Sequence, residues 1–451
     1  MNYEIMKIEN VEVYELEIPI DLGTSSIPSP QNFLKGKSLD FCLVKIETDD
    51  GVVGWGDAFS YNCRQAVALA IQHMVKPLLM NKDPRDILGI NSMLQKSLHL
   101  YGRYGITMFA ISGVDIALWD ILGKRLNKPL YQIFGADGTY QIPAYASLWR
   151  YENPDVVVDR LGMAKADGYT KVKLHEIGID EVRAARDFLG NDFPLMLDTN
   201  CPWSYNEAKE KAIAFKEFDL YWLEEPINPP EDFAGLAKLK SDCGLAIASG
   251  ENACTSYQFK EMLLKQAVDF AQPSVTKVGG ITEFRKVSAI CESWGVQIMP
   301  HSPYFGPGFL ATLHMAQSSI SPGFVERLFV NLEANLYPER ILNPNNGAFT
   351  VLHGAGLGED PDLDVIKTYL KKENIIVYDE HYIHTWPKHP YDYLVKIIKD
   401  KKWDKLSIGL EMDAHYFTAF CYEKIKQGLP NAKLKDSDRL VNWARLVKSD
   451  T

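Results

Sequence analysis

Hydrophobic and polar positions follow two different patterns along the chain, and the change falls near residue 140. Before that point, short apolar runs of strand character are followed by three stretches with helical spacing. After it, short apolar runs and helical stretches alternate strictly. Strands followed by helices are typical of an α+β lobe, whereas strict alternation is typical of a parallel sheet covered by helices. The pattern therefore predicts two regions of different architecture.

The first region is predicted to begin with an antiparallel sheet. Asp49-Asp50-Gly51 is a turn signal between two apolar runs and predicts a hairpin. A polar loop at 21–38, which contains Ser and Pro, is long enough to form a lid. The predicted strands are Ile8–Leu16, Phe41–Thr48 and Val52–Trp55, and the predicted helices are 64–80, 85–98 and 107–125.

The second region is predicted to form a closed parallel barrel, because eight strand candidates are separated by crossover helices. The strand candidates are Ile142–Ser147, Lys171–Leu174, Leu195–Asp198, Tyr221–Glu224, Ala246–Ser249, Phe270–Gln272, Gln297–Pro300 and Phe324–Leu328. Helical spacing occurs between them, for example at 154–167, 206–217, 256–266 and 281–294.

After about residue 350 the chain is predicted to leave the barrel, through a glycine-rich loop at Gly354–Gly358 and a short helix at Asp362–Lys372. The remaining part differs in composition: it contains several aromatic and histidine residues and a lysine-rich run at 399–402. It is predicted to be an appended lobe with a strand at Leu406–Leu410 and a helix at 416–426.

Three acidic residues, Asp198, Glu224 and Glu251, stand where successive barrel strands end, each one strand–helix unit from the next. Parallel strands bring these ends to one face of a barrel, where barrel enzymes place their chemistry. Converging carboxylates repel one another unless a cation lies between them, and an all-oxygen ligand set suits Mg²⁺. Any one of the three could be a strand-end acid facing solvent, but the regular spacing favours a metal site for the set.

Lys171 and Lys173 lie two residues apart on one strand, so both are predicted to face the barrel interior. Lysine is rarely buried, and a second ammonium with partial burial lowers the pKa of a lysine and yields a neutral amine. We therefore interpret the pair as containing a general base, although a single lysine there could merely neutralise an acid. His175 continues the same face and could line the site; a loop histidine is the simpler interpretation.

His301 follows the strand Gln297–Pro300 and is predicted to lie across the barrel from Lys173. Opposite a lysine, with a metal between them, it is an acid/base candidate; alone it would be a structural histidine. Glu326 is a further candidate site residue that faces the barrel interior; alternatively, it forms an ion pair with an arginine. Together these groups suit removal of a proton α to a carboxylate, because a metal and further donors can stabilise the dianionic enediolate.

Composition limits the classes of partner. The hydrophobic fraction of 46% and the charged fraction of 24% are those of an ordinary globular protein. The formal net charge of −11 argues against nucleic acid or an anionic membrane as partner, whereas a bound metal would still permit an anionic substrate. Apolar stretches fall short of the ~20 residues that span a bilayer. Seven scattered cysteines without C-x-x-C spacing indicate reduced thiols and a cytoplasmic protein.

These motifs resemble the enolase superfamily, and within it the mandelate racemase subgroup, over about residues 5–370. The resemblance implies an α/β fold: a modified TIM barrel, (β/α)7β, closed by an N-terminal α+β capping domain, with the appended C-terminal segment beyond it. We expect the cap at 1–135 with a return segment at 351–373, the barrel at 136–350 and the appended lobe at 374–451. We also expect a small-molecule carboxylate substrate and a homo-oligomer.

The resemblance also implies roles for individual residues. The metal ligands of the family, which bind Mg²⁺, match the three strand-end acids. The family's lysine pair matches Lys171 and Lys173, of which the second is the base. The histidine of strand seven matches His301, and the glutamate that bonds the intermediate matches Glu326. Asn200 matches an asparagine that follows the first ligand.

One position departs from the resemblance. Where the family usually has an aspartate that orients the histidine, this chain has Ser274. Without that carboxylate, His301 loses the partner that fixes its tautomer and raises its basicity, unless another acid or a water replaces it. This predicts that His301 donates a proton better than it accepts one, which favours a one-base dehydratase or cycloisomerase over a symmetric racemase.

The tail resembles part of the N-terminal domain of creatinase- and prolidase-like hydrolases, through Gly409–Asp413, Leu429–Ala432 and Leu440–Trp443, and no peptidase activity is expected from it. Three functions stay open. The favoured one is Mg²⁺-dependent dehydration of a sugar acid. The second is a racemase, epimerase or lactone cycloisomerase on a similar acid. The third is a non-catalytic binding protein that uses the appended lobe.

Overall fold

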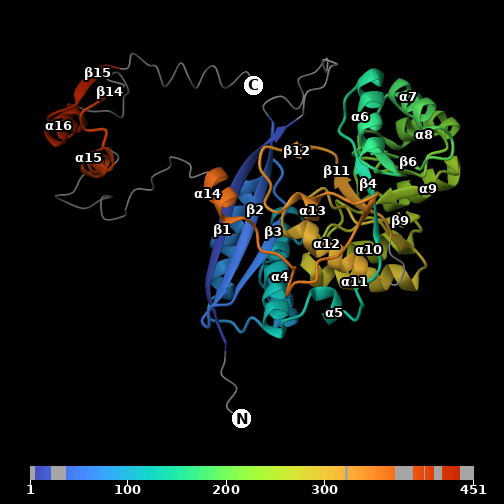
Figure 1. Ribbon diagram of the computed structural model, residues 1–451, viewed down its shortest axis with the longest axis horizontal. Helices are drawn as coiled ribbons and strands as arrows, with labels where there is room; N and C mark the ends of the chain where they lie inside the picture. Colours follow the sequence, from blue (N-terminus) through green and yellow to red (C-terminus); the bar gives the residue numbers. More distant parts are fainter. Residues whose placement is uncertain are drawn as a thin grey trace, which may run out of the picture. The chain divides into compact units, whose positions relative to one another are not determined.

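The structure, a computed structural model, describes residues 6–21, 37–319, 323–370, 390–400, 402–410 and 419–436. The chain forms two compact units, residues 1–371 and 372–451. A cap and a barrel lie together in the first unit (Figure 1). The domain boundaries expected from the sequence stay predictions. The proposed lid falls mostly on residues 22–36, outside the described residues.

The cap is built on an antiparallel sheet with the strand order β12-β1-β2-β3. Its strands are β1 Ile8–Asp21, β2 Ser38–Thr48, β3 Val53–Ala58 and, from far along the chain, β12 Asn331–Leu332. The predicted hairpin between β2 and β3 is confirmed: Gly51 takes a φ of 84° at its turn and donates to the Thr48 carbonyl. Only glycine adopts that conformation without strain.

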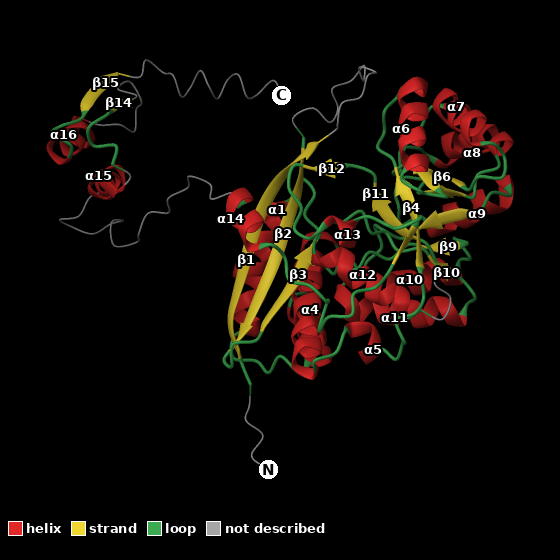
Figure 2. Ribbon diagram, viewed as in Figure 1, coloured by secondary structure: helices red, strands yellow, loops and turns green. Residues whose placement is uncertain are grey.

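The cap helices follow the predicted ranges. They are α1 Arg64–Ala70, continued by a π-helical turn Ile71–Val75 and α2 Lys76–Leu79, then α3 Ile87–Ser97 and α4 Gly105–Leu126. Helix α4 packs on β3 (Figure 2). The contact is very close, since a Cβ on Gly56 would lie 1.9 Å from the Gly113 carbonyl oxygen.

Helix α4 corrects one expectation from the sequence. By length and composition it could cross a membrane, so the expectation that apolar stretches fall short of this length is wrong. Its most apolar 18-residue window is 78% buried inside the protein. Its buried acid Asp120 accepts from the backbone N–H of Trp55 and of Leu357. An apolar helix with satisfied buried polar groups is the core helix of the cap.

The barrel strands follow one another in parallel, in the order β10-β9-β8-β7-β6-β5-β4-β11, with the short antiparallel β13 Ala348–Phe349 beside β4. They are β4 Ile142–Ser147, β5 Val172–Leu174, β6 Leu195–Asp198, β7 Trp222–Glu224, β8 Ile247–Ser249, β9 Phe270–Ala271, β10 Gln297–Ile298 and β11 Val325–Leu328.

Seven crossover helices separate these strands and surround them (Figure 1). They are α6 Pro154–Ala166, α7 Ile179–Leu189, α8 Tyr205–Phe215, α9 Phe233–Cys243, α10 Thr255–Leu264, α11 Gly280–Ser293 and α12 Pro307–Gln317. The shorter helices are α5 Leu130–Ile133, α13 Glu339–Leu342 and α14 Leu363–Tyr369. The predicted (β/α)7β barrel with an α+β cap is confirmed.

The last two strands meet through a side chain. Among the described residues no ladder joins β10 to β11. Instead the Oγ of Ser302, just after β10, donates to the Glu326 carbonyl at 2.9 Å and accepts from the Glu326 N–H at 3.0 Å. The segment before β11 can approach β10 closely because residue 323 is glycine: a Cβ there would lie 2.0 Å from the backbone oxygen of Ile298.

The second unit is a small α/β lobe of α15 Pro390–Asp400, β14 Ser407–Leu410, α16 Ala419–Gly428 and β15 Lys433–Asp436. Its two strands are parallel, and its core holds Val395, Ile398, Leu410, Ile425 and Leu429. The strand predicted at 406–410 is confirmed, whereas the helix predicted at 416–426 begins at Ala419 in the described residues. Helix α15 was not predicted, although Tyr391, Leu394, Val395 and Ile398 have helical spacing.

Candidate active site

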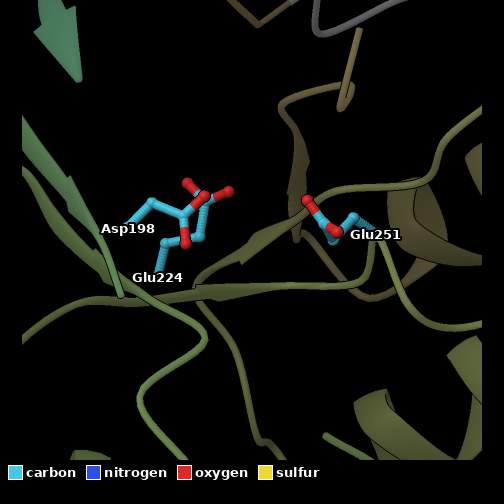
Figure 3. A group of neighbouring side chains, drawn as sticks. All are labelled: Asp198, Glu224 and Glu251. Carbon is cyan, nitrogen blue, oxygen red and sulfur yellow. The ribbon is translucent and has the colours of Figure 1, made fainter. Parts of the chain in front are cut away.

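The three strand-end acids come together at the carboxyl ends of the barrel strands. One carboxylate oxygen from each of Asp198, Glu224 and Glu251 lies within 4.8 Å of the others. Figure 3 shows the Asp198 and Glu224 carboxylates side by side, with Glu251 facing them from the other side of the group. This geometry can hold a metal ion.

The local sequence explains this convergence. Asp198 and Glu224 are register partners on β6 and β7, so their side chains leave the sheet at the same level. Glu251 lies beyond the end of β8 and reaches the group through the turn at Gly250, where φ is 139°. A Cβ at that glycine would lie 2.9 Å from the backbone nitrogen of Gln272, so a larger residue does not fit there.

Lys173 lies under these acids and is fully buried. Its Nζ is 3.2 Å from Asp198 Oδ2, 2.9 Å from Glu224 Oε1 and 2.9 Å from Glu326 Oε1. Burial alone lowers the pKa of Lys173, but the charges of Glu224, Glu326 and Asp198 outweigh burial and hold this pKa well above its usual value. The sequence argument expected a lowered pKa, and in this structure that expectation is wrong.

Negative charge exceeds positive charge in the cluster. The carboxylates of Glu326 and the three strand-end acids face two ammonium groups, those of Lys173 and Lys277. Burial and the neighbouring Asp198 carboxylate raise the pKa of Glu224 well above its usual value. Carboxylate oxygens with surplus negative charge are the donor set of a hard divalent cation. The residues present therefore fit the ion that the spacing predicted.

Lys171 is not brought to this cluster. Its Nζ lies 4.5 Å from the centre of the Phe324 ring and donates to Thr170 Oγ1. Burial lowers the pKa of Lys171. Lys171 directly precedes β5, two residues before Lys173. The residues on this face that contact the strand-end acids are instead Lys173 and His175.

His175 lies in the site, on the side of β5. Its Nε2 is 3.2 Å from Asp198 Oδ2, and its Nδ1 is 2.5 Å from the Leu148 carbonyl oxygen. A carbonyl only accepts, so Nδ1 carries a proton, and Nε2 holds the lone pair in the neutral ring. The Asp198 carboxylate is also an acceptor, so the contact of Nε2 with Oδ2 is a hydrogen bond when Nε2 is protonated as well. The His175 side chain keeps 18% of its surface exposed, whereas Lys173 keeps none.

His301 lies on the other side of the cluster, after β10. Its Nε2 is 2.8 Å from Glu251 Oε2, and its Nδ1 is 3.0 Å from the hydroxyl of Tyr304. That hydroxyl makes a short hydrogen bond with the Oγ of Ser274. The position of the absent aspartate is thus linked to His301 through a tyrosine.

Glu326 and Asn200 complete the cluster. Glu326 Oε1 accepts from Ser147 Oγ at 2.7 Å, and its Oε2 accepts from the backbone N–H of Ser302 at 3.2 Å. Asn200 donates to Asp198 Oδ1 from its backbone N–H and from its side chain. The alternative of an ion pair between Glu326 and an arginine is not found in the described residues, where its cationic partner is Lys173.

Two residues of the cluster were missed in the sequence. Lys277 is buried, and its Nζ is 3.3 Å from Glu251 Oε1 and 4.6 Å from the Phe59 ring of the cap. The sequence contained a signal for Lys277, which stands just before Gly279-Gly280: a lysine in an apolar run at the end of a strand needs a partner of opposite charge. Tyr304 had no such signal, because only the folded loop brings its hydroxyl to His301.

The chain matches two families over most of its first unit. Residues 26–135 match the mandelate racemase / muconate lactonizing enzyme N-terminal domain, and residues 157–365 match the enolase C-terminal domain-like family. Residues 363–447 match the creatinase/prolidase N-terminal domain.

Known proteins resemble the chain at moderate identity. An arabinonate dehydratase of Saccharolobus solfataricus is 31% identical over 330 residues, which cover 71% of this chain and 88% of the relative. A 3,6-anhydro-alpha-L-galactonate cycloisomerase of Streptomyces coelicolor is 34% identical over 303 residues, 64% of this chain and 80% of the relative. The crystal structure of a racemase from Streptomyces coelicolor A3(2) with bound magnesium has a TM-score of 0.69 and 30% identity, covering 80% of this chain and 99% of that one.

Proposed function

Because the chain belongs to the mandelate racemase / muconate lactonizing enzyme family of the enolase superfamily, we propose that it dehydrates a sugar acid by Mg²⁺-dependent removal of the proton α to the carboxylate. The observation that carries this proposal is the cluster of strand-end acids between two histidines. The resemblance noted in the sequence is confirmed, including that of the tail.

Asp198, Glu224 and Glu251 would hold the metal. Bound Mg²⁺ would supply a Lewis acid that stabilises the negative charge developing on the substrate when the α-proton is removed. The excess of carboxylates over ammonium groups supports this assignment, and so does the all-oxygen donor set. Glu326, which accepts from Ser147 and Ser302, is proposed to hydrogen-bond the intermediate.

His175 is proposed to remove the α-proton in place of Lys173, the residue expected from the sequence. An ammonium has three N–H donors, and Lys173 directs them to Asp198, Glu224 and Glu326. It is therefore a fixed positive charge beneath the reacting atoms. In its neutral form His175 has a lone pair on Nε2, and its ring keeps an exposed edge; a general base requires both.

His301 is proposed to donate a proton to the hydroxyl that leaves the β-carbon. It lies across the cluster from His175, since its Nε2 contacts Glu251 whereas that of His175 contacts Asp198. Loss of water after proton removal gives an enol that becomes a 2-keto acid. The names of the relatives, a dehydratase and a cycloisomerase of sugar-derived acids, support a substrate of this class.

A panel of sugar acids incubated with the chain and Mg²⁺ in D₂O tests the proposal. Formation of a keto acid that stops when the metal is chelated is the expected result. Deuterated substrate or an isomer, without keto acid, would instead show the second candidate, a racemase, epimerase or lactone cycloisomerase, which the cycloisomerase relative supports.

Absence of both products across the panel, together with a protein partner retained by residues 372–451, would favour the non-catalytic alternative.

We further propose a homo-oligomer in the cytoplasm. Among the described residues no cysteine forms a disulfide, in keeping with reduced thiols. Light scattering of the purified chain tests the oligomer, and localisation of a tagged chain tests the compartment.

A further inference from the structure

The Nδ1 atom of His301 meets a neutral phenol in this chain. The Tyr304 hydroxyl lies 3.0 Å from it, and the two rings are 5.7 Å apart at 80°, an edge-to-face arrangement. On the far side, the same hydroxyl bonds Ser274, whose Oγ is 3.4 Å from Thr276 Oγ1. Within the described residues no carboxylate reaches Nδ1.

Tyr304 is itself held firmly. Its carbonyl accepts from Arg327 Nη1 at 3.1 Å, and the Arg327 guanidinium stacks on Phe305 at 3.7 Å. One residue earlier in the loop, the Pro303 carbonyl accepts from the hydroxyl of Tyr61 in the cap at 2.5 Å. Barrel and cap therefore fix the loop that carries the phenol.

A phenol and a carboxylate differ in the hydrogen bonds and in the charge that they present to a histidine ring. The Tyr304 hydroxyl has one proton and two lone pairs, so it can donate to Nδ1 or accept from Nδ1–H. A carboxylate can only accept, and its charge also favours the imidazolium form. Burial holds the pKa of Tyr304 well above its usual value, so the side chain stays a phenol.

We propose that Tyr304, backed by Ser274, is the positioning residue that holds the His301 ring with Nε2 toward the strand-end acids. The hydroxyl does so without adding a negative charge behind the ring. This inference rests on the proposed function in one respect, the role of His301 as proton donor. Removing the hydroxyl then affects the step in which His301 gives up its proton and spares the removal of the α-proton.

Steady-state kinetics of Tyr304→Phe separate the two steps. We expect kcat for keto-acid formation to fall roughly 10- to 100-fold while KM and the α-deuterium exchange rate change by less than about threefold. Ser274→Ala is expected to lower kcat less, and Ser274→Ala with Tyr304→Phe to lower it no more than Tyr304→Phe alone, because the two groups act in series. Equal loss of exchange and keto-acid formation, or no loss of either, would overturn the proposal.

Histidine-labelled ¹⁵N NMR of the full chain without substrate gives a second readout, independent of turnover. His301→Gln identifies the His301 signals. Tyr304→Phe is expected to shift the Nδ1 resonance, whereas Tyr337→Phe is the matched control, since the Tyr337 hydroxyl is buried without a partner in the described residues. An unchanged Nδ1 resonance in Tyr304→Phe would overturn the positioning role. A shifted resonance without turnover on any sugar acid would refute the proposed function alone.

Discussion

At the scale of single residues, the contacts of each nitrogen decide which groups can exchange a proton. The Nζ of Lys173 is saturated by three carboxylates, whereas the Nε2 of His175 contacts Asp198 and holds a lone pair when the ring is neutral. Lys173 lies on β5, and His175 directly follows this strand on the same face. This difference in contacts is the basis of the different roles proposed for the two residues.

His175→Asn is expected to slow α-proton removal by roughly 10²- to 10⁴-fold, because asparagine can still donate to the Leu148 carbonyl but cannot take the proton. Deuterium incorporation followed by NMR measures this rate. Calorimetry should show little change in Mg²⁺ affinity, which separates loss of the base from loss of the metal. Lys171→Met, a change on the same strand outside the cluster, is the control. Wild-type exchange in His175→Asn would return the role of base to Lys173.

The sequence predicted the three acids and His301 because parallel strands must end at one face, whatever the details of packing. It grouped Lys171 with Lys173, since a period of two predicts the face of a strand but not the depth of a residue along it. It missed Tyr304, whose approach to His301 depends on a loop held by Arg327. Loop directions follow from tertiary contacts and have no sequence period.

At the scale of elements, glycines set how closely the cap helix approaches its sheet. Gly54 and Gly56 on β3 face α4 with no side chain between, and Gly113 on α4 faces Val44 and Ala58. The close contact buries a helix that is apolar nearly all round. Length and hydropathy alone cannot separate such a helix from a membrane span, whereas its burial inside the protein identifies it as a core helix.

Gly56→Ala is expected to destabilise the protein by roughly 2–4 kcal/mol, because the new methyl group meets backbone atoms that cannot move aside. Gly162→Ala is the matched control. Gly162 lies inside α6, where the nearest atom to a new Cβ is 3.8 Å away, so this change should add about 0.5–1 kcal/mol of stability. Urea unfolding measures both, and equal effects of the two substitutions would contradict the packing.

Asp57 on β3 makes a further contact between cap and barrel. It is buried, and its Oδ2 accepts from the Gly308 N–H in the first turn of α12 at 3.2 Å. Burial raises the pKa of Asp57 from 3.8 to about 7. Between these values the native state keeps a proton that the unfolded chain has released. Native stability therefore falls as pH rises through this window and levels off above it.

Asp57→Asn removes this pH dependence and can still accept from Gly308. We expect the variant to gain stability relative to wild type between pH 4 and 7, by roughly 1–4 kcal/mol in total, with no further gain above pH 8. Unfolding in urea at several pH values measures the difference. Asp187→Asn, at an exposed position, should show a constant difference from wild type. A constant difference for Asp57→Asn as well would contradict the burial effect.

At the scale of the whole molecule, the barrel and its cap were predictable because each strand–helix unit repeats the same pattern. The closure of β10 on β11 was not predictable, since the Ser302 side chain makes it in place of a backbone ladder. The second unit was predicted only in part, for its small core gives each element few apolar positions. Every site residue named above lies in the first unit.

Removal of residues 372–451 is therefore expected to leave kcat/KM within about threefold of the full chain, because no site residue is lost. The melting temperature of the first unit should also be retained. Activity assays and thermal unfolding of both proteins check this. A truncated chain that folds and binds Mg²⁺ but has lost its activity would show that the creatinase-like lobe contributes to the reaction.

Crystals of the full chain soaked in Mn²⁺, which replaces Mg²⁺ and scatters anomalously, test most directly whether the barrel holds a divalent cation. The predicted result is one anomalous peak bonded, at about 2.0–2.3 Å, to an oxygen of each of Asp198, Glu224 and Glu251. A peak elsewhere, or none while the three carboxylates stay apart, would contradict the proposed chemistry.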